Sequence, residues 1–291
     1  MSTGYKSFHE SSIKDPKGFW AEQAKLVDWH KPFDQVFDYS NPPFAKWFIG
    51  GQTNLCHNAV DRHLKDRAQQ IALVAVSTET EQERTYTFEE LHAEVNRMAA
   101  ILQAHGVVKG DRVLIYMPMI AQACFAMLAC ARIGAIHSVV FGGFASHSLA
   151  SRIDDAKPKM IITAEAGMRG GKAVPYKPLL DEAITLASYK PEKVLIVNRG
   201  LSDYSTVANR DIDYASEREK HLNSKVPVEW VDATHPSYIL YTSGTTGKPK
   251  GVQRDTGGYA VALASSMRLI FGGNPGETMF TTSDIGWVVG H

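Results

Sequence analysis

Short apolar runs alternate with amphipathic segments along the middle of the chain, from position 111 to position 197. The apolar runs predict strands over residues 113–117, 136–140, 160–163 and 194–197, and the segments between them predict helices over 121–133, 148–156 and 178–187. Strands of about five residues alternating with helices of about ten are typical of parallel pairing through right-handed crossovers. The pattern therefore predicts an α/β fold in which parallel-rich sheets are layered with helices.

The first part of the chain has the pattern of an arm. Asp15-Pro16 precedes a segment with near-helical apolar spacing, and proline favours the first turn of a helix, so a helix is expected over 17–29. Residues 28–47 are rich in proline and aromatic side chains. We expect them to form an extended segment that lies over the main domain and carries no chemistry.

Between the arm and the alternating region, the sequence predicts two helices and two strands. Residues 58–67 suggest a helix, 71–76 a buried strand and 84–88 a second strand. Thr87 and Glu90 then have the spacing of a capping box, which marks the start of a helix that Gly106 ends.

The last third of the chain changes character. Residues 198–232 are polar and show little periodicity apart from a helical pattern near 214–222, which suggests an excursion between subdomains. Beyond it the pattern predicts strands over 238–241, 252–254 and 278–282 and a helix over 258–270. We therefore divide the chain into an arm (1–55), an α/β subdomain (56–235) and the start of a second subdomain (236–291).

Composition limits the kind of protein. The 291 residues are 44% hydrophobic and carry a formal net charge of zero, so no overall charge favours nucleic acid or an acidic membrane. Cys56, Cys124 and Cys130 lack CxxC spacing, and the last two lie in an apolar helical pattern, which favours reduced thiols. No signal-peptide or membrane-spanning run is found. A cytoplasmic enzyme without nucleic-acid or membrane partners is expected.

The stretch YTSGTTGKPKG, which begins at Tyr241, has the composition of a phosphate-binding loop. Its glycines let backbone N–H groups approach an anion, its hydroxyls donate hydrogen bonds, and its lysines add positive charge. It is not a Walker loop, because only two residues separate Gly244 from Gly247 and Pro249 follows Lys248. The residues expected to bind phosphate are Thr242, Ser243, Gly244, Thr245, Thr246, Gly247 and Lys248.

Two more glycine pairs follow predicted strands. Gly142 and Gly143 stand between two phenylalanines after the strand at 136–140 and permit the close approach of a ligand or of another backbone. The loop expected over 165–172 contains Met168-Arg169-Gly170-Gly171-Lys172, in which two cations flank two glycines. Such a loop suits a phosphate group, although a solvated basic turn is the alternative.

The chain is similar to the adenylate-forming superfamily. The stretch from Tyr241 resembles the superfamily's signature phosphate loop, and WAEQAKLVDWHKPFDQV, FGGFASHSLASRIDDAKPK and TSDIGWVVGH resemble the short-chain acyl-CoA synthetases, the propionate-CoA ligases most closely. The resemblance implies an AMP-forming acid-thiol ligase that uses ATP, Mg²⁺ and coenzyme A. It extends from about position 19 to the end of the sequence.

The resemblance also implies roles for individual residues. Lys248 and Thr245 would stabilise the phosphates of ATP, and no metal ligand is assigned. The residues implied in coenzyme A binding are Gly142, Gly143, Arg169, Gly170, Gly171 and Lys172, of which Lys172 departs from the arginine that acetate enzymes tend to have. Trp287, Val288 and Val289 would line the acyl pocket, with His291 as its scaffold.

The acyl-pocket residues bear on the substrate. Acetate enzymes carry Val-Thr where this chain has Val288-Val289, and a more apolar pocket favours one added methylene by up to about 1–3 kcal/mol. We therefore expect propionate as the carboxylate substrate, with acetate as the alternative. Family members are roughly twice as long, so the sequence is expected to be a fragment that is inactive alone, and a noncatalytic binding module is the alternative of another class.

Overall fold

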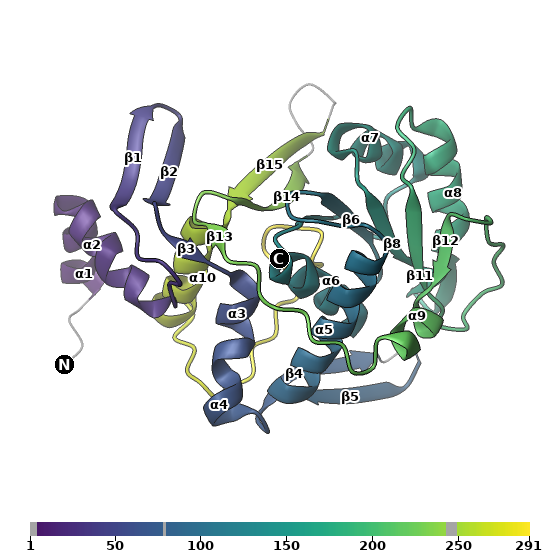
Figure 1. Ribbon diagram of the computed structural model, residues 1–291, viewed down its shortest axis with the longest axis horizontal. Coiled ribbons are helices and arrows are strands. Elements are labelled where there is room, and N and C mark those ends of the chain that lie inside the picture. The colour runs from purple at the N-terminus through teal and green to yellow at the C-terminus, as the bar shows by residue number, and fades with distance from the viewer. Residues whose placement is uncertain (1–4, 78–79, 243–248) are drawn as a thin grey trace.

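The computed structural model describes residues 5–77, 80–242 and 249–291 and places a seven-stranded sheet at the centre of the protein (Figure 1). Its strands are β6 (Arg112–Tyr116), β7 (Ile136–Val139), β8 (Met160–Ala164), β11 (Lys193–Val197), β12 (Asp211–Asp213), β14 (Pro236–Thr242) and β15 (Lys250–Asp255). They lie in the order β12, β11, β8, β6, β7, β14, β15. Neighbouring strands run parallel except β14 and β15, so the expected parallel-rich α/β fold is confirmed.

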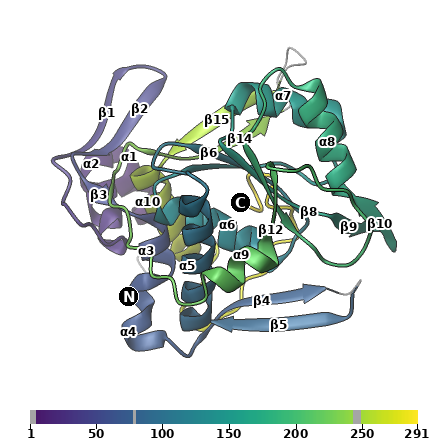
Figure 2. The ribbon, with the colours of Figure 1, turned by 45° about the vertical axis from the view of Figure 1, so that its right-hand side comes forward.

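Each face of the sheet is covered by its own helices (Figure 2). Val113 and Ile115 of β6 belong to the core under α5 (Phe88–Ala104) and α6 (Ala121–Arg132). Leu114 and Tyr116 point the other way, into the core under α7 (Ser146–Ala156) and α8 (Tyr176–Leu186). Strands buried on both faces carry apolar side chains at most positions, which explains the apolar runs in the sequence.

The predicted strands and helices between 113 and 197 all occur, with ends that differ by at most two residues. The capping box at the start of α5 is also present. The Thr87 hydroxyl accepts the N–H of Glu90 at 3.2 Å, and the Glu90 carboxylate accepts the N–H of Thr87 at 2.8 Å. Gly106 follows the helix with a φ of 82°, which glycine adopts at little cost.

The unit before the sheet differs from its prediction. The helix expected over 58–67 is split into α3 (Leu55–Ala59), a 3₁₀ turn η2 (Asp61–His63) and α4 (Leu64–Arg67). β4 (Ile71–Ser77) pairs with β5 (Gln82–Thr87) in a separate antiparallel hairpin, and the prediction of a buried strand was wrong. Ile71 and Val76 are 55% and 61% exposed, because only one face of the hairpin packs on the protein core.

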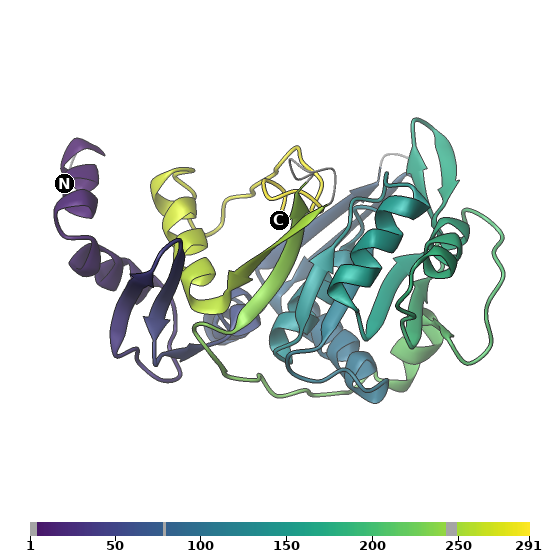
Figure 3. The same cartoon turned by 90° about the horizontal axis from the view of Figure 1, so that it is seen from above.

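The arm packs at one end of the molecule, beside α10 (Thr256–Leu269) (Figure 3). It contains α1 (Tyr5–Lys14), α2 (Pro16–Gln23), the 3₁₀ turn η1 (Ala24–Leu26) and a hairpin of β1 (Gln35–Asn41) and β2 (Phe44–Ile49). Ala24, Val27 and Phe48 form a third core with Ala233 and Val261. The segment expected to be extended is therefore a hairpin, and the arm completes its core with residues from the far end of the chain.

The polar segment at 198–232 ends beside the arm. It forms α9 (Tyr214–Lys220), and β13 (Val231–Asp232) then pairs with β3 (Gln52–Thr53).

The strand predicted over 278–282 is absent from the described residues, and Met279 and Phe280 are 50% and 85% exposed. Residues 278–282 have no hydrogen-bonded strand beside them within the described chain, and a strand needs such a neighbour to be stable. Among the described residues no helix is both long and apolar enough to cross a membrane.

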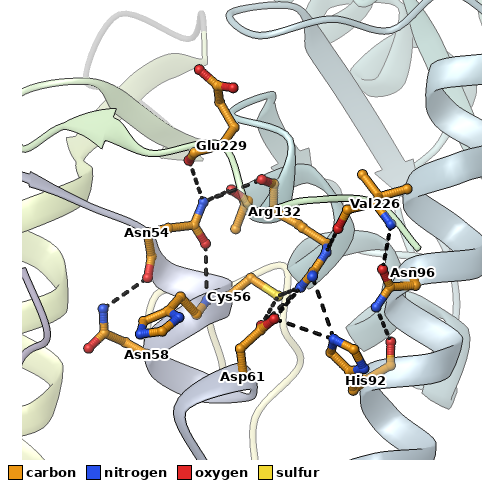
Figure 4. A network of polar contacts seen from close by, with 11 residues as sticks. Asn54, Cys56, Asn58, Asp61, His92, Asn96, Arg132, Val226 and Glu229 are labelled. Atoms are coloured by element: carbon orange, nitrogen blue, oxygen red, sulfur yellow. Dashed lines mark hydrogen bonds and ion pairs between the residues drawn. The ribbon is translucent and has the colours of Figure 1, made fainter. Parts of the chain in front are cut away.

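Arg132 joins three separate segments at the end of α6 (Figure 4). The Arg132 side chain is buried; its Nη1 contacts both carboxylate oxygens of Asp61 at 2.9 Å, and its Nε donates to the carbonyl of Val226 at 2.6 Å. Burial alone would raise the pKa of the Asp61 carboxyl, but hydrogen bonds from His92 and Arg132 hold it below its usual range. Asn54 adds hydrogen bonds to the carbonyls of residues 131 and 229.

Candidate functional site

A cavity of about 560 Å³ lies beyond the carboxyl ends of β6, β7, β8 and β11. Residues that follow each of these strands line it, among them Met119, Phe144, Met168 and Arg199. Ligands of open α/β sheets bind beyond the carboxyl ends of the strands. The structure therefore brings the glycine loop at 141–144 and the segment at 165–172 into the wall of one cavity.

The loop at 141–144 is held by tyrosines. Tyr116 is fully buried, and its hydroxyl donates to the carbonyls of Gly142 at 3.4 Å and Phe144 at 3.2 Å. The ring of Tyr176 stacks on Tyr116 at 4.9 Å and approaches Gly142 so closely that a Cβ there would lie 2.2 Å from the Tyr176 hydroxyl. Glycine at position 142 is thus required for this packing, whether or not it also contacts a ligand.

The segment expected to be a loop at 165–172 is instead an antiparallel hairpin of β9 (Ala166–Arg169) and β10 (Lys172–Pro175). Gly170 and Gly171 form its turn with φ values of 56° and 73°, which suit two glycines. Arg169 lines the cavity and its guanidinium lies against Gly143. Lys172 pairs opposite Arg169, but the cavity wall formed by the described residues does not include it.

The segment at 284–291 packs against the glycine loop at 141–144. The ring of Trp287 packs against Phe141 at 5.8 Å and Phe144 at 6.1 Å between centroids. Val288 and Val289 are 66% and 73% exposed, so they enclose no pocket among the described residues. Asp284 lines the cavity and accepts the N–H of Gly286 at 2.7 Å, and burial raises the pKa of its carboxyl.

Two histidines lie beneath this segment. The Nε2 atoms of His137 and His291 are 3.0 Å apart, and His291 Nδ1 lies 3.1 Å from the carbonyl oxygen of Ile285. The carbonyl can only accept, so His291 carries its proton on Nδ1 and accepts at Nε2 from His137. Burial keeps the pKa of His137 well below its usual value and lowers that of His291 to about 4. His291, expected to be a scaffold residue, is fixed in place by a neutral histidine pair.

The strand that leads to the predicted phosphate loop contacts the same region. The hydroxyl of Tyr241 donates to Asp155 at 2.7 Å, and the buried guanidinium of Arg152 lies over the rings of Phe144 and Tyr241. Thr242 is exposed at the end of β14 and pairs opposite Lys250. The other residues predicted to bind phosphate, Ser243, Gly244, Thr245, Thr246, Gly247 and Lys248, lie outside the described residues.

Three residues of this region, Tyr116, His137 and Arg199, were not predicted from the sequence. Tyr116 and His137 are polar side chains inside apolar strand runs, and Arg199 follows β11. A polar group within a buried run needs a hydrogen-bond partner, and this requirement was the available signal.

Gly286→Ala is expected to lower the free energy of unfolding by about 1–3 kcal/mol. A Cβ at this position would lie 2.7 Å from the backbone N of Phe141, and backbone cannot move aside as a side chain can. Urea unfolding would measure the loss. Val288→Ala is the control, since an exposed side chain should change stability by less than about 0.5 kcal/mol. Equal effects of the two substitutions would mean that the segment does not pack on this loop.

The sequence matches a known class of protein. Residues 60–291 match the family described as AMP-binding enzyme, and residues 5–59 match the acetyl-coenzyme A synthetase N-terminus. Because the first match covers most of the chain, the protein is a member of the AMP-binding enzyme family.

Individual members of this family can be compared with the chain. The chain is 62% identical over 287 residues to the propionate–CoA ligase of Escherichia coli, covering 99% of this chain and 46% of that protein. It is 48% identical to the human acyl-CoA synthetase short-chain family member 3, mitochondrial, covering 99% of this chain and 42% of that protein. Acetoacetyl-CoA synthetase from Streptomyces lividans has a similar structure, with a TM-score of 0.88, 29% identity and coverage of 98% of this chain and 43% of that one. The chain spans less than half the length of these relatives.

Proposed function

We propose that the chain contributes to an AMP-forming acid-thiol ligase that converts propionate, ATP and coenzyme A to propionyl-CoA, AMP and pyrophosphate. The observation that carries this proposal is the 62% identity to a propionate–CoA ligase over 99% of the chain. Acetate is the second candidate, supported by 45% identity to an acetyl-coenzyme A synthetase of Xanthobacter autotrophicus. A noncatalytic module that binds coenzyme A or nucleotide is the candidate of another class. The three unpaired cysteines among the described residues suit a cytoplasmic enzyme.

The chemistry would proceed in two steps. A carboxylate oxygen attacks the α-phosphorus of ATP, pyrophosphate leaves, and a mixed acyl-phosphate anhydride forms. The thiol of coenzyme A then attacks the acyl carbon and AMP leaves. Charge gathers on the leaving phosphates in the first step, and we assign its stabilisation to residues 242–248, with Thr245 and Lys248 foremost.

The cavity suits the second substrate. We assign Gly142, Gly143 and Arg169 to coenzyme A, because two glycines and a guanidinium meet in one wall. Gly170, Gly171 and Lys172 at the hairpin turn would contact its outer end, and Trp287, Val288 and Val289 would contact the acyl group. Mg²⁺ would neutralise the phosphates. The described residues hold no group of three or more His, Cys, Asp or Glu placed to bind it, so we assign it no ligand here. We also propose that the chain is divided into an arm (1–55), an α/β subdomain (56–235) and the start of a second subdomain (236–291).

A chimera tests the assignment. The chain joined to the remainder of the Escherichia coli propionate–CoA ligase should catalyse ATP–pyrophosphate exchange faster with propionate than with acetate or butyrate. In this chimera Val289→Thr should shift the preference toward acetate by about tenfold, because a hydroxyl makes the pocket less apolar. Val108→Thr, at a valine that is 62% exposed, is the control. If no carboxylate supports exchange, the ligase proposal fails, and if acetate is preferred before any substitution, propionate is the wrong substrate.

A further inference from the structure

Arg199 provides the cavity with a second guanidinium. It follows β11, lies partly buried in the cavity wall that also contains Arg169, and donates from Nη1 to the carbonyl of Ala166 at 3.3 Å. Within the described part of the chain, neither arginine has a carboxylate partner within 4.0 Å. Among the described residues of the wall, the one other charged side chain is that of Asp284. The cavity therefore carries two guanidinium groups that form no ion pair with any described residue.

The position of Arg199 is fixed by a buried carboxylate. Glu165 is 0% exposed, and its two oxygens accept the backbone N–H groups of Arg199 and Leu201, each at 2.8 Å. Gly200 lies between these two donors with a φ of 72°, which lets both N–H groups face the same carboxylate. A carboxylate removed from water is costly unless its oxygens are hydrogen-bonded. The side chain of Glu165 thus holds the turn from which Arg199 extends.

The main chain of Glu165 also holds the first turn of α8, which contributes Tyr176 to the cavity wall. Its carbonyl accepts the N–H groups of Tyr176 at 2.8 Å and Lys177 at 3.1 Å, which sets the start of α8. Tyr176 is the ring that packs against Gly142. One residue therefore connects the arginine turn, the first turn of α8 and the glycine loop.

We propose that Arg199 is a second phosphate-binding residue of the cavity and that Glu165 is the positioning residue that holds it there. The inference rests on the proposed function, in which the cavity takes coenzyme A. A guanidinium offers a fork of donors that matches phosphate oxygens, and a charge left without a carboxylate partner is available for an anionic ligand. Coenzyme A carries both a phosphomonoester and a diphosphate, and either group could supply the oxygens.

Calorimetric titration of the chain with coenzyme A, dephospho-coenzyme A and pantetheine tests the role of Arg199. Arg199→Gln should weaken coenzyme A binding by about tenfold or more and leave pantetheine, which has no phosphate, unchanged. A loss with coenzyme A alone would assign Arg199 to the phosphomonoester, and a loss with dephospho-coenzyme A as well would assign it to the diphosphate. Arg268→Gln, at an exposed arginine of α10, should bind as the wild type does. Unchanged coenzyme A binding, or an equal loss with pantetheine, would overturn the role of Arg199.

The positioning role of Glu165 is tested by a double-mutant cycle. Glu165→Gln should weaken coenzyme A binding in the wild-type background and have little further effect when Arg199 is already glutamine, because it acts through Arg199. Additive losses would overturn this role. If Glu165→Gln does not fold, Glu165→Asp retains the charge with a shorter reach and should give an intermediate loss by the same cycle.

Different results would overturn the coenzyme A site and the role of Arg199. A wild-type chain that binds coenzyme A no more tightly than pantetheine would overturn the coenzyme A site, and the inference about Arg199 with it. Preferential binding of coenzyme A that survives Arg199→Gln would overturn the inference alone and leave the proposed function standing.

Discussion

Replacing Arg132 by methionine should lower the free energy of unfolding by about 3–5 kcal/mol, because the substitution leaves a partly buried carboxylate without its cation. The side chains of Arg132 and Asp61 are only 5% and 16% exposed, and Arg132 also satisfies the carbonyl of Val226. Urea unfolding followed by tryptophan fluorescence would measure the loss.

The matched control for Arg132 is Lys109→Met. Lys109 pairs with Glu229 at 3.0 Å, but both side chains are 46% exposed, so this pair should contribute less than about 1 kcal/mol. Adding Asp61→Leu to Arg132→Met should recover part of the loss, since a buried ion pair replaced by apolar groups can be neutral. Similar losses for the two methionine variants would contradict the structural role assigned to Arg132.

Acidification should destabilise the protein between about pH 6.5 and pH 4 through the buried histidine pair. The pKa of His137 is well below its usual value and that of His291 is about 4, so in this range the unfolded chain binds protons that the folded chain does not. Stability therefore rises with pH, by up to about 1.4 kcal/mol per pH unit for each neutral histidine. Urea unfolding at a series of pH values between 4 and 7 would measure the slope.

Variants isolate the contribution of the pair. His137→Gln can still donate to His291 but does not titrate, so its stability should depend less steeply on pH than that of the wild type. His9→Gln, at an exposed histidine of α1, should have the wild-type slope. If His137→Gln also has the wild-type slope, the histidine pair is not the source of the pH dependence.

Local patterns were enough to predict most of the sheet. Between 113 and 197 each helix and each strand of the central sheet has its own apolar run or stripe, and Thr87 with Glu90 forms a capping box that depends on four residues alone. Such features depend on neighbours in the sequence, so they can be predicted without knowing the tertiary fold. Family membership was predictable for the same reason, because its signature motifs are contiguous.

Features that depend on distant partners were not predicted. The apolar run at β4 gives no sign that one of its faces is left without a covering layer, and the residues at 278–282 give no sign that the described chain pairs no strand with them. The partnership of Glu165 with the turn at Arg199 joins residues 34 positions apart. The contact of His137 with His291 spans 154 positions. Burial and pairing of this kind follow from the tertiary fold.

The third core has a consequence for the order in which the chain folds during synthesis. Ala24, Val27 and Phe48 pack against Ala233 and Val261, and a hydrogen bond between Gln52 and Asp232 spans 180 residues. At translation rates of 5–20 residues per second, the arm leaves the ribosome roughly 10–40 s before its partners are made. During that interval the surface of the arm that packs against Ala233 and Val261 has no partner. The arm is thus synthesised well before the residues that complete its core.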